Sequence, residues 1–123
     1  MMNKTILIAD DSNSLRQMVA MTLTQAGYQV IEAVHGQDAV EKAVDQTIHL
    51  VITDLNMPVM NGIELIKQLR SGTTHRFTPM LMLTTESDAT KKQEGRAAGA
   101  TGWILKPFNP DQLLAVIKKV LPA

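Results

Sequence analysis

The chain has 123 residues, which suits one domain with a buried core and is short for two independent domains. Its 45% hydrophobic and 20% charged residues are typical of globular domains and exclude disordered or fibrous classes. Twelve basic and twelve acidic side chains cancel, which argues against nucleic-acid or membrane partners, and the lack of cysteine excludes disulfides and thiolate metal sites. No signal peptide precedes the first strand-like segment, so a cytoplasmic protein is expected.

Short apolar runs alternate along the chain with longer segments of helical spacing, which predicts alternating strands and helices. The run at residues 6–9 is too short for a core helix and too apolar for a half-exposed strand. It is typical of a central parallel strand that is covered on both faces. Ser12 or Asn13 is the expected cap of the first helix, and Gly27 is its expected end.

The middle of the chain continues this alternation. A second strand is expected at residues 28–33, and a helix from about Gln37 follows with one apolar face formed by Ala39, Val40, Ala43 and Val44. A third strand at residues 49–53 ends at Asp54. The next helix stops near Gly72, and its apolar residues are Ile63, Leu65, Ile66 and Leu69.

The last third of the chain predicts two strands and two helices. The strands are expected at residues 80–83 and 101–105. The helix at residues 89–98 has the weaker signal, because Gly95 lowers its propensity. The final helix has a natural cap in Asn109, and Pro110 suits its first position.

Polar or charged side chains follow four of the five predicted strands: Asp10 and Asp11, Asp54, Thr84, and Lys106. Alternating strands and helices imply a parallel sheet wound on both faces, and ligands of such folds bind beyond the carboxyl ends of the strands. These side chains are therefore expected to meet at one edge. Three neighbouring carboxylates would repel one another without a cation, and oxygen ligands without histidine or cysteine favour Mg²⁺.

Lys106 and Thr84 add a compact positive charge and a hydroxyl at the same edge. Together with the cation, they are suited to neutralise the oxygens of a phosphoryl group during transfer. Asp54 is the candidate carboxylate nucleophile, because the loop at residues 55–58 leaves space for a phosphoryl donor. No glycine-rich phosphate loop follows the first strand, which argues against a nucleotide or flavin module.

The set formed by Asp10, Asp11, Asp54, Thr84 and Lys106, with a proline after the lysine, resembles that of response-regulator receiver domains in two-component signalling. The resemblance extends over essentially the whole chain and favours the free-standing, CheY-like chemotaxis type. It implies a flavodoxin-like (βα)5 fold, with a doubly wound five-stranded parallel sheet in the strand order 2-1-3-4-5. A single receiver domain over residues 1–123, without an output domain, is expected.

The resemblance also implies how the cation is held. In this family the ligands are one acid of the pair, the acceptor, and the backbone carbonyl two residues after the acceptor. Mg²⁺ is therefore assigned to Asp11, Asp54 and the carbonyl of Asn56, with Asp10 acting through water. The bond between Lys106 and Pro107 is expected to be cis, as is typical of the family.

A conformational switch is implied in the same way. The family couples the site threonine, here Thr84, to an aromatic residue on the fifth strand, here Trp103. Phosphorylation is expected to draw Thr84 toward the phosphoryl oxygens and to let the ring move inward. The surface formed by the fourth helix, fifth strand and fifth helix would then change. Core filling stays open as an alternative for Trp103, because large aromatic residues usually bury for their area alone.

The leading hypothesis is a switch that a histidine kinase phosphorylates on Asp54 and that signals by docking to a target protein. A phosphatase is a further candidate partner, and no enzymatic activity is expected beyond self-phosphorylation and slow self-dephosphorylation. Asn56 and Glu86 favour the chemotaxis branch by resemblance. A phosphorelay intermediate is one alternative. A Mg²⁺-dependent phosphatase with an aspartyl nucleophile is another, although haloacid dehalogenase-type enzymes carry a second aspartate where this chain has Asn56.

Overall fold

A computed structural model describes residues 4–44, 46–85 and 89–121. The elements, in chain order, are β1 (Thr5–Ala9), α1 (Asn13–Gln25), β2 (Gln29–Ala33), α2 (Gly36–Ala43), β3 (Leu50–Asp54), α3 (Gly62–Ser71), β4 (Met80–Thr84), α4 (Ala89–Ala98), β5 (Gly102–Leu105) and α5 (Pro110–Val120). Every predicted strand and helix is present, with bounds close to the predicted ones. Glu86, one of the two residues that favoured chemotaxis, lies outside the described residues.

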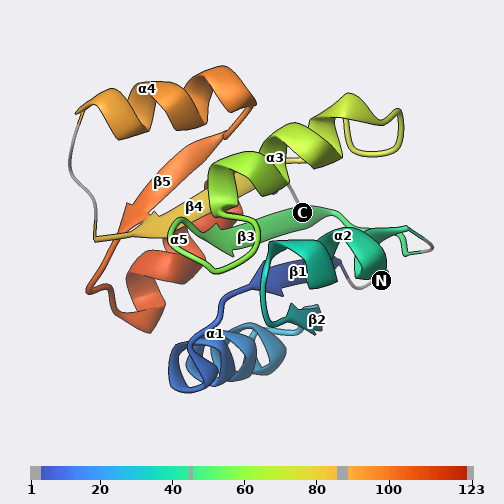
Figure 1. The fold of residues 1–123 in the computed structure, drawn as a ribbon. Helices are drawn as coiled ribbons and strands as arrows, with labels where there is room; N and C mark the ends of the chain where they lie inside the picture. The colour runs from blue at the N-terminus through green and yellow to red at the C-terminus, as the bar shows by residue number, and fades with distance from the viewer. Residues whose placement is uncertain (1–3, 45, 86–88, 122–123) are drawn as a thin grey trace.

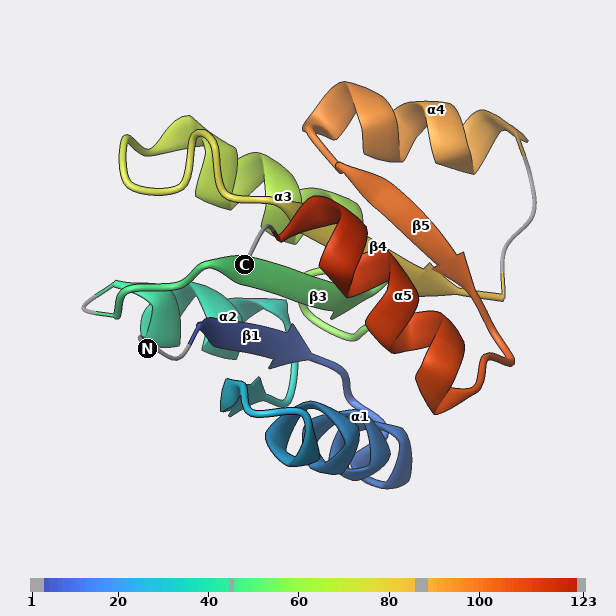
Figure 2. The same ribbon diagram turned by 180° about the vertical axis from the view of Figure 1, so that it is seen from behind.

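The five strands form one parallel sheet in the order β2-β1-β3-β4-β5, seen in Figure 1 and from behind in Figure 2. The predicted flavodoxin-like topology is therefore confirmed. The strand order reverses at β1, which pairs with β2 on one side and with β3 on the other. Ligand sites of such sheets lie where the order reverses, so the carboxyl ends of β1 and β3 are the expected place for a site.

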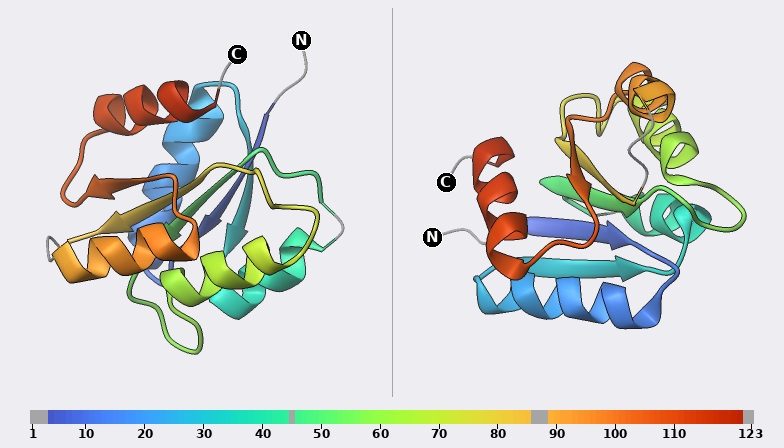
Figure 3. Two further views of the ribbon diagram at one scale, coloured as in Figure 1. Left: turned by 90° about the horizontal axis from the view of Figure 1, so that it is seen from above. Right: turned by 90° about the vertical axis from the view of Figure 1, so that its left-hand side faces the viewer.

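Helices cover both faces of the sheet: α1 and α5 lie on one face, and α2, α3 and α4 lie on the other (Figure 3). Two sets of buried side chains fill the space between the sheet and these helices. All residues of β3 and β4 are buried, which explains why these strands are mainly apolar rather than alternating. Within the described part of the chain, no helix is long and apolar enough to cross a membrane.

Hydrogen-bonded caps fix where four of the helices begin. Ser12 is the cap of α1, because its hydroxyl accepts a hydrogen bond of 3.3 Å from the backbone N–H of Leu15. Helices α3 and α5 begin with reciprocal capping boxes, formed by Asn61 with Glu64 and by Asn109 with Gln112. Each box satisfies two backbone N–H groups that would otherwise lack partners. The predicted cap and first-position proline of α5 are confirmed.

Helix α2 has two features that the sequence did not indicate, its cap and the exposure of Val44. His35 caps it, since its ring Nδ1 accepts a hydrogen bond of 3.1 Å from the N–H of Asp38. This role could not be predicted, because histidine is not a preferred cap residue. Val44, predicted on one apolar face with Ala39, Val40 and Ala43, lies just past the end of α2 at Ala43 and is 70% exposed.

Candidate functional site

Three carboxylates lie together at the carboxyl edge of the sheet. Asp10 and Asp11 follow β1, and Asp54 is the last residue of β3, the neighbouring strand. One oxygen from each carboxylate lies within 4.8 Å of the other two. This spacing offers three oxygen ligands around one point, which suits a hard cation such as Mg²⁺.

The Asp10 carboxylate is the most enclosed of the three. Asp10 is 1% exposed, and its Oδ1 accepts a hydrogen bond of 2.9 Å from the N–H of Ser12. Its Oδ2 is buried and has no hydrogen-bond partner among the described residues. Burial raises the pKa of the Asp10 carboxyl, the Ser12 hydrogen bond opposes this, and the charge of Asp54 raises it further. A cation beside Oδ2 would relieve both costs, so the residues present fit Mg²⁺.

Lys106 forms an ion pair with Asp54. Its Nζ lies 2.7 Å from Asp54 Oδ1, and the two side chains are 19% and 10% exposed. The lysine follows β5, and the bond to Pro107 is cis, as the resemblance implied. A mostly buried charge-assisted hydrogen bond of this length fixes both side chains in one orientation.

Thr84 and Asn56 occupy the same edge. Thr84 is the last residue of β4 and is 1% exposed. Its backbone oxygen accepts a hydrogen bond of 2.9 Å from Lys106 N, which ties the loop after β5 to the end of β4. Asn56 is exposed in the loop after β3. The structure thus gathers the ends of four strands at one edge, as the βα pattern predicts.

The comparison with known families agrees with this geometry. Residues 6–118 match the family described as response regulator receiver domain. The chain belongs to this family. Its members are the phosphorylation switches of two-component systems, so the receiver domain described here is such a switch.

Several known proteins resemble this receiver domain closely. It is 50% identical to the chemotaxis protein CheY4 of Vibrio cholerae, with a TM-score of 0.95 and coverage of 98% of this chain and 100% of that chain. It is 39% identical over 121 residues to the phosphate regulon transcriptional regulatory protein PhoB of Pseudomonas aeruginosa, and 35% identical over 120 residues to the transcriptional regulatory protein SrrA of Staphylococcus aureus. It covers 53% and 48% of those two proteins, so it spans about half their length.

A glycine that the sequence reasoning missed supports the Asp54 backbone. Gly62 is the first residue of α3, and its N–H donates a hydrogen bond of 2.9 Å to the oxygen of Leu55. A Cβ at Gly62 would overlap the backbone oxygen of Asp54 and lie 2.6 Å from the sulfur of Met82. The receiver domain therefore needs glycine here for a close approach of α3 to β3. The feature of the sequence that could have indicated this close approach is a glycine directly after the helix cap Asn61.

The loop between β3 and α3 contains a strained turn. Val59 has a φ of 70°, and the N–H of Met60 donates a hydrogen bond of 2.7 Å to the oxygen of Pro58. This is a γ-turn with positive φ at its centre, a rare and strained conformation, and a β-branched residue suits it poorly. The Val59 side chain is 79% exposed, so packing does not explain the residue. Strain of this kind costs about 1 to 3 kcal/mol.

Trp103 stands apart from the acid cluster. It lies on β5 and is partly buried against the apolar side chains under α2, α3 and α4. Its six-membered ring packs directly on Gly95 of α4, where a Cβ would overlap Cζ2 and lie 2.9 Å from Cη2. The glycine that weakens the helix signal in the sequence is therefore the residue that makes room for the indole.

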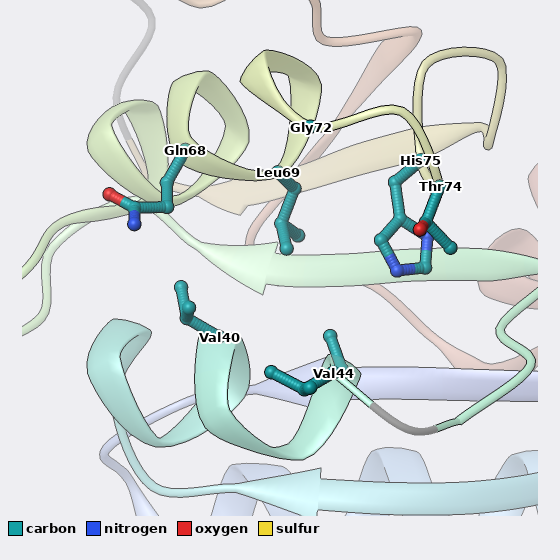
Figure 4. Close-up of a pocket in the computed structure, with 8 residues that line it drawn as sticks. Val40, Val44, Gln68, Leu69, Gly72, Thr74 and His75 are labelled. Atoms are coloured by element: carbon teal, nitrogen blue, oxygen red, sulfur yellow. The ribbon is translucent and has the colours of Figure 1, made fainter.

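A separate pocket of about 270 Å³ lies between α2, α3 and the segment after α3 (Figure 4). Val40, Val44 and Leu69 form its apolar side, and His75 lies beside it. The ring of His75 is buried, with Nδ1 3.4 Å from the Thr78 hydroxyl oxygen. Helices α2 and α3 run back across the sheet, so the pocket lies at the amino ends of the strands. The acid cluster lies at the opposite edge.

Replacing Asp10 with asparagine is expected to stabilise the metal-free receiver domain at neutral pH. The pKa of this carboxyl is raised on folding from its ordinary value of 3.8, so below pH 3.8 the carboxyl costs the fold no stability. As the pH rises from 3.8 to the raised value, the carboxyl destabilises the fold progressively. An amide carries no charge and escapes this cost. We expect the melting temperature to rise by about 4 °C, the shift produced by about 1 kcal/mol in a domain of this size.

Thermal unfolding in the presence of EDTA measures this effect. The difference from the wild type should shrink as the pH falls below 3.8, where the wild-type carboxyl becomes protonated in the unfolded state as well as in the folded state. Asp11→Asn is the matched control: Asp11 is exposed in the same loop, so its removal should change the metal-free melting temperature little. A metal-free Asp10→Asn variant that melts at or below the wild-type temperature at neutral pH would contradict the prediction.

Proposed function

We propose that this receiver domain accepts a phosphoryl group on Asp54 from a histidine kinase and that Mg²⁺ is required. The observation that carries the proposal is the 2.7 Å ion pair between Lys106 Nζ and Asp54 Oδ1, beside two further carboxylates. Phosphoryl transfer to aspartate requires a nucleophilic carboxylate, a positively charged side chain held in place beside it, and oxygen ligands for a metal ion.

Each residue has a distinct part in this chemistry. Asp11, Asp54 and the backbone carbonyl of Asn56 would hold Mg²⁺ directly, and Asp10 would act through water. When bound, Mg²⁺ supplies positive charge against the phosphoryl oxygens. An Asp54 carboxylate oxygen forms the new bond to phosphorus while the phosphorus–nitrogen bond of the phosphohistidine breaks. Lys106 then moves from the carboxylate to a phosphoryl oxygen.

The output of the switch is proposed to pass through Thr84 and Trp103. The Thr84 hydroxyl donates to a phosphoryl oxygen, and the space it leaves lets the Trp103 ring move inward. The packing of this ring on Gly95 supports the proposal, because a change in the ring acts directly on α4. Trp103 is the sole tryptophan, so its fluorescence emission should change on phosphorylation. An unchanged emission would count against Trp103 as the moving part.

The surface formed by α4, β5 and α5 is the proposed docking site for a target protein, and chemotaxis is the proposed pathway. The 50% identity to the chemotaxis protein CheY4, over the whole of that chain, supports this branch. The domain would act in the cytoplasm, with a phosphatase as a further partner. Its only catalysis would be its own phosphorylation and slow dephosphorylation.

Phosphorylation by a small donor tests the proposal. Incubation with phosphoramidate or acetyl phosphate and Mg²⁺ should add one phosphoryl group, measured as intact mass. Asp54→Asn or chelation of Mg²⁺ should abolish the adduct. Asp111→Asn is the control, because Asp111 is an exposed carboxylate on α5. An adduct that persists in Asp54→Asn would move the acceptor elsewhere, and steady hydrolysis of varied phosphate esters would indicate a phosphatase instead.

A further inference from the structure

A buried arginine contacts the loop that carries Asp10 and Asp11. Arg16 lies in α1 and is 8% exposed, and among the described residues it is the only buried lysine or arginine. Burying a guanidinium is costly unless its N–H groups are paired. The partners of Arg16 therefore indicate what the buried charge is for.

The guanidinium donates to three acceptors, two in the loop of residues 10–13 and one on β2. Nη1 donates a hydrogen bond of 2.8 Å to the backbone oxygen of Asp10, and Nη2 donates one of 2.6 Å to Oδ1 of Asn13. These two acceptors flank Asp11, so one side chain holds the acidic loop at both ends. Nε donates a hydrogen bond of 3.2 Å to Oε1 of Glu32 on β2, the strand beside which α1 lies (Figure 3).

Other contacts complete the restraint on Asp10. Its backbone N–H donates a hydrogen bond of 3.1 Å to the oxygen of Ala33, and its Oδ1 accepts from Ser12 N. With its carbonyl held by Arg16, Asp10 is fixed through three of its four polar groups. The remaining one is Oδ2, the buried oxygen without a partner among the described residues.

We propose that Arg16 is a positioning residue for the cation: it holds the loop of residues 10–13 so that Asp10 and Asp11 present their oxygens without rearrangement. The inference rests on the proposed Mg²⁺ site. A ligand loop that is ordered before binding loses less conformational entropy when the ion binds. The role is geometric, because the compact ammonium of a lysine cannot reach three acceptors that a guanidinium fork spans.

Titration calorimetry with Mg²⁺ alone tests the proposal on folded protein. Arg16→Gln should raise the Mg²⁺ dissociation constant by about tenfold or more, the usual effect of losing a residue that orients metal ligands. Arg16→Lys should weaken binding as well. In phosphorylation by phosphoramidate, the Mg²⁺ concentration for half-maximal rate should rise in proportion, whereas the rate at saturating Mg²⁺ should stay close to that of the wild type.

Arg70→Gln is the matched control. The Arg70 guanidinium also donates to backbone oxygens, those of His75, Arg76 and Gly99, but at the amino edge of the sheet. Its loss should destabilise the fold and leave the Mg²⁺ dissociation constant unchanged. A metal-free readout is hydrogen exchange at the Ser12 amide, which should accelerate in Arg16→Gln and not in Arg70→Gln.

Three results would overturn the inference. One is a dissociation constant for Arg16→Gln within about twofold of the wild-type value, well below the expected effect. Another is equal weakening by Arg70→Gln, since lost stability would then explain both variants. The third is full rescue by Arg16→Lys, which would make the role one of charge alone. If the wild type itself binds no Mg²⁺, the proposed metal site fails first, and the two failures are distinguished by that titration.

Discussion

Gly62→Ala is expected to lower the free energy of unfolding by about 2 to 3 kcal/mol, the upper part of the range for atoms forced into a packed interior. The added Cβ would overlap the backbone oxygen of Asp54 and crowd the sulfur of Met82. The methionine side chain can turn away. The Asp54 backbone cannot, because β3 is a central strand with β1 and β4 paired on either side.

The same substitution should slow phosphorylation of Asp54. A displacement of about 1 Å at a reacting group can reduce its rate by about 100-fold. Denaturant unfolding and the rate of phosphoramidate phosphorylation measure the two effects. Gly72→Ala is the control, since the nearest atom to its Cβ would be the Leu69 oxygen at 3.9 Å and its φ is −85°. Equal stability of the two variants would show that α3 can shift without cost.

Gly95→Ala is expected to move the Trp103 ring or the helix that covers it. Alanine is the better helix former by about 1 kcal/mol, so propensity alone predicts stabilisation. Overlap of the new Cβ with the indole opposes this by about 1 to 3 kcal/mol. We expect a net loss of about 1 kcal/mol, because the clash exceeds the gain in propensity. The ring, once displaced outward, should emit at longer wavelength.

A double-mutant cycle separates the clash from the helix propensity. Trp103→Phe carries a smaller ring, so Gly95→Ala in that background should stabilise the protein instead of destabilising it. Circular dichroism during denaturant unfolding measures all four proteins of the cycle, because the two that carry Trp103→Phe have no tryptophan. Ala97→Gly, at an exposed position of α4, calibrates propensity alone. Additive effects of the two substitutions would mean that the ring and the glycine do not constrain each other.

The position of the acid cluster could be predicted because it depends on topology and on few residues. Parallel strands place their carboxyl ends at one edge, so Asp10, Asp54 and Lys106 had to converge once the βα alternation was recognised. The caps at Ser12 and Asn109 were equally accessible, since capping is a local hydrogen bond between a side chain and a backbone N–H a few residues away.

The contacts that support the cluster could not be predicted, because they depend on which atoms meet across the fold. The sequence alone does not assign the roles of Gly62 and Gly95, because their contacts form only when α3 packs on β3 and the Trp103 indole packs on α4. From the sequence alone, Arg16 would be expected to be a solvated charge on α1, because its three acceptors come close to it only in the folded chain. The exposure of Val44 could not be predicted for a local reason, since the apolar period runs one residue past the end of α2.

The positive φ at Val59 affects how strongly the loop after Asp54 favours its observed turn. Strain raises the free energy of this turn alone, so a rearrangement that relieves the positive φ recovers what the strain costs. A difference of about 1 to 3 kcal/mol corresponds to a factor of about 5 to 150 in the ratio between the rearranged and the observed turn. One exposed residue outside the acid cluster therefore shifts the conformational equilibrium of the loop that follows Asp54.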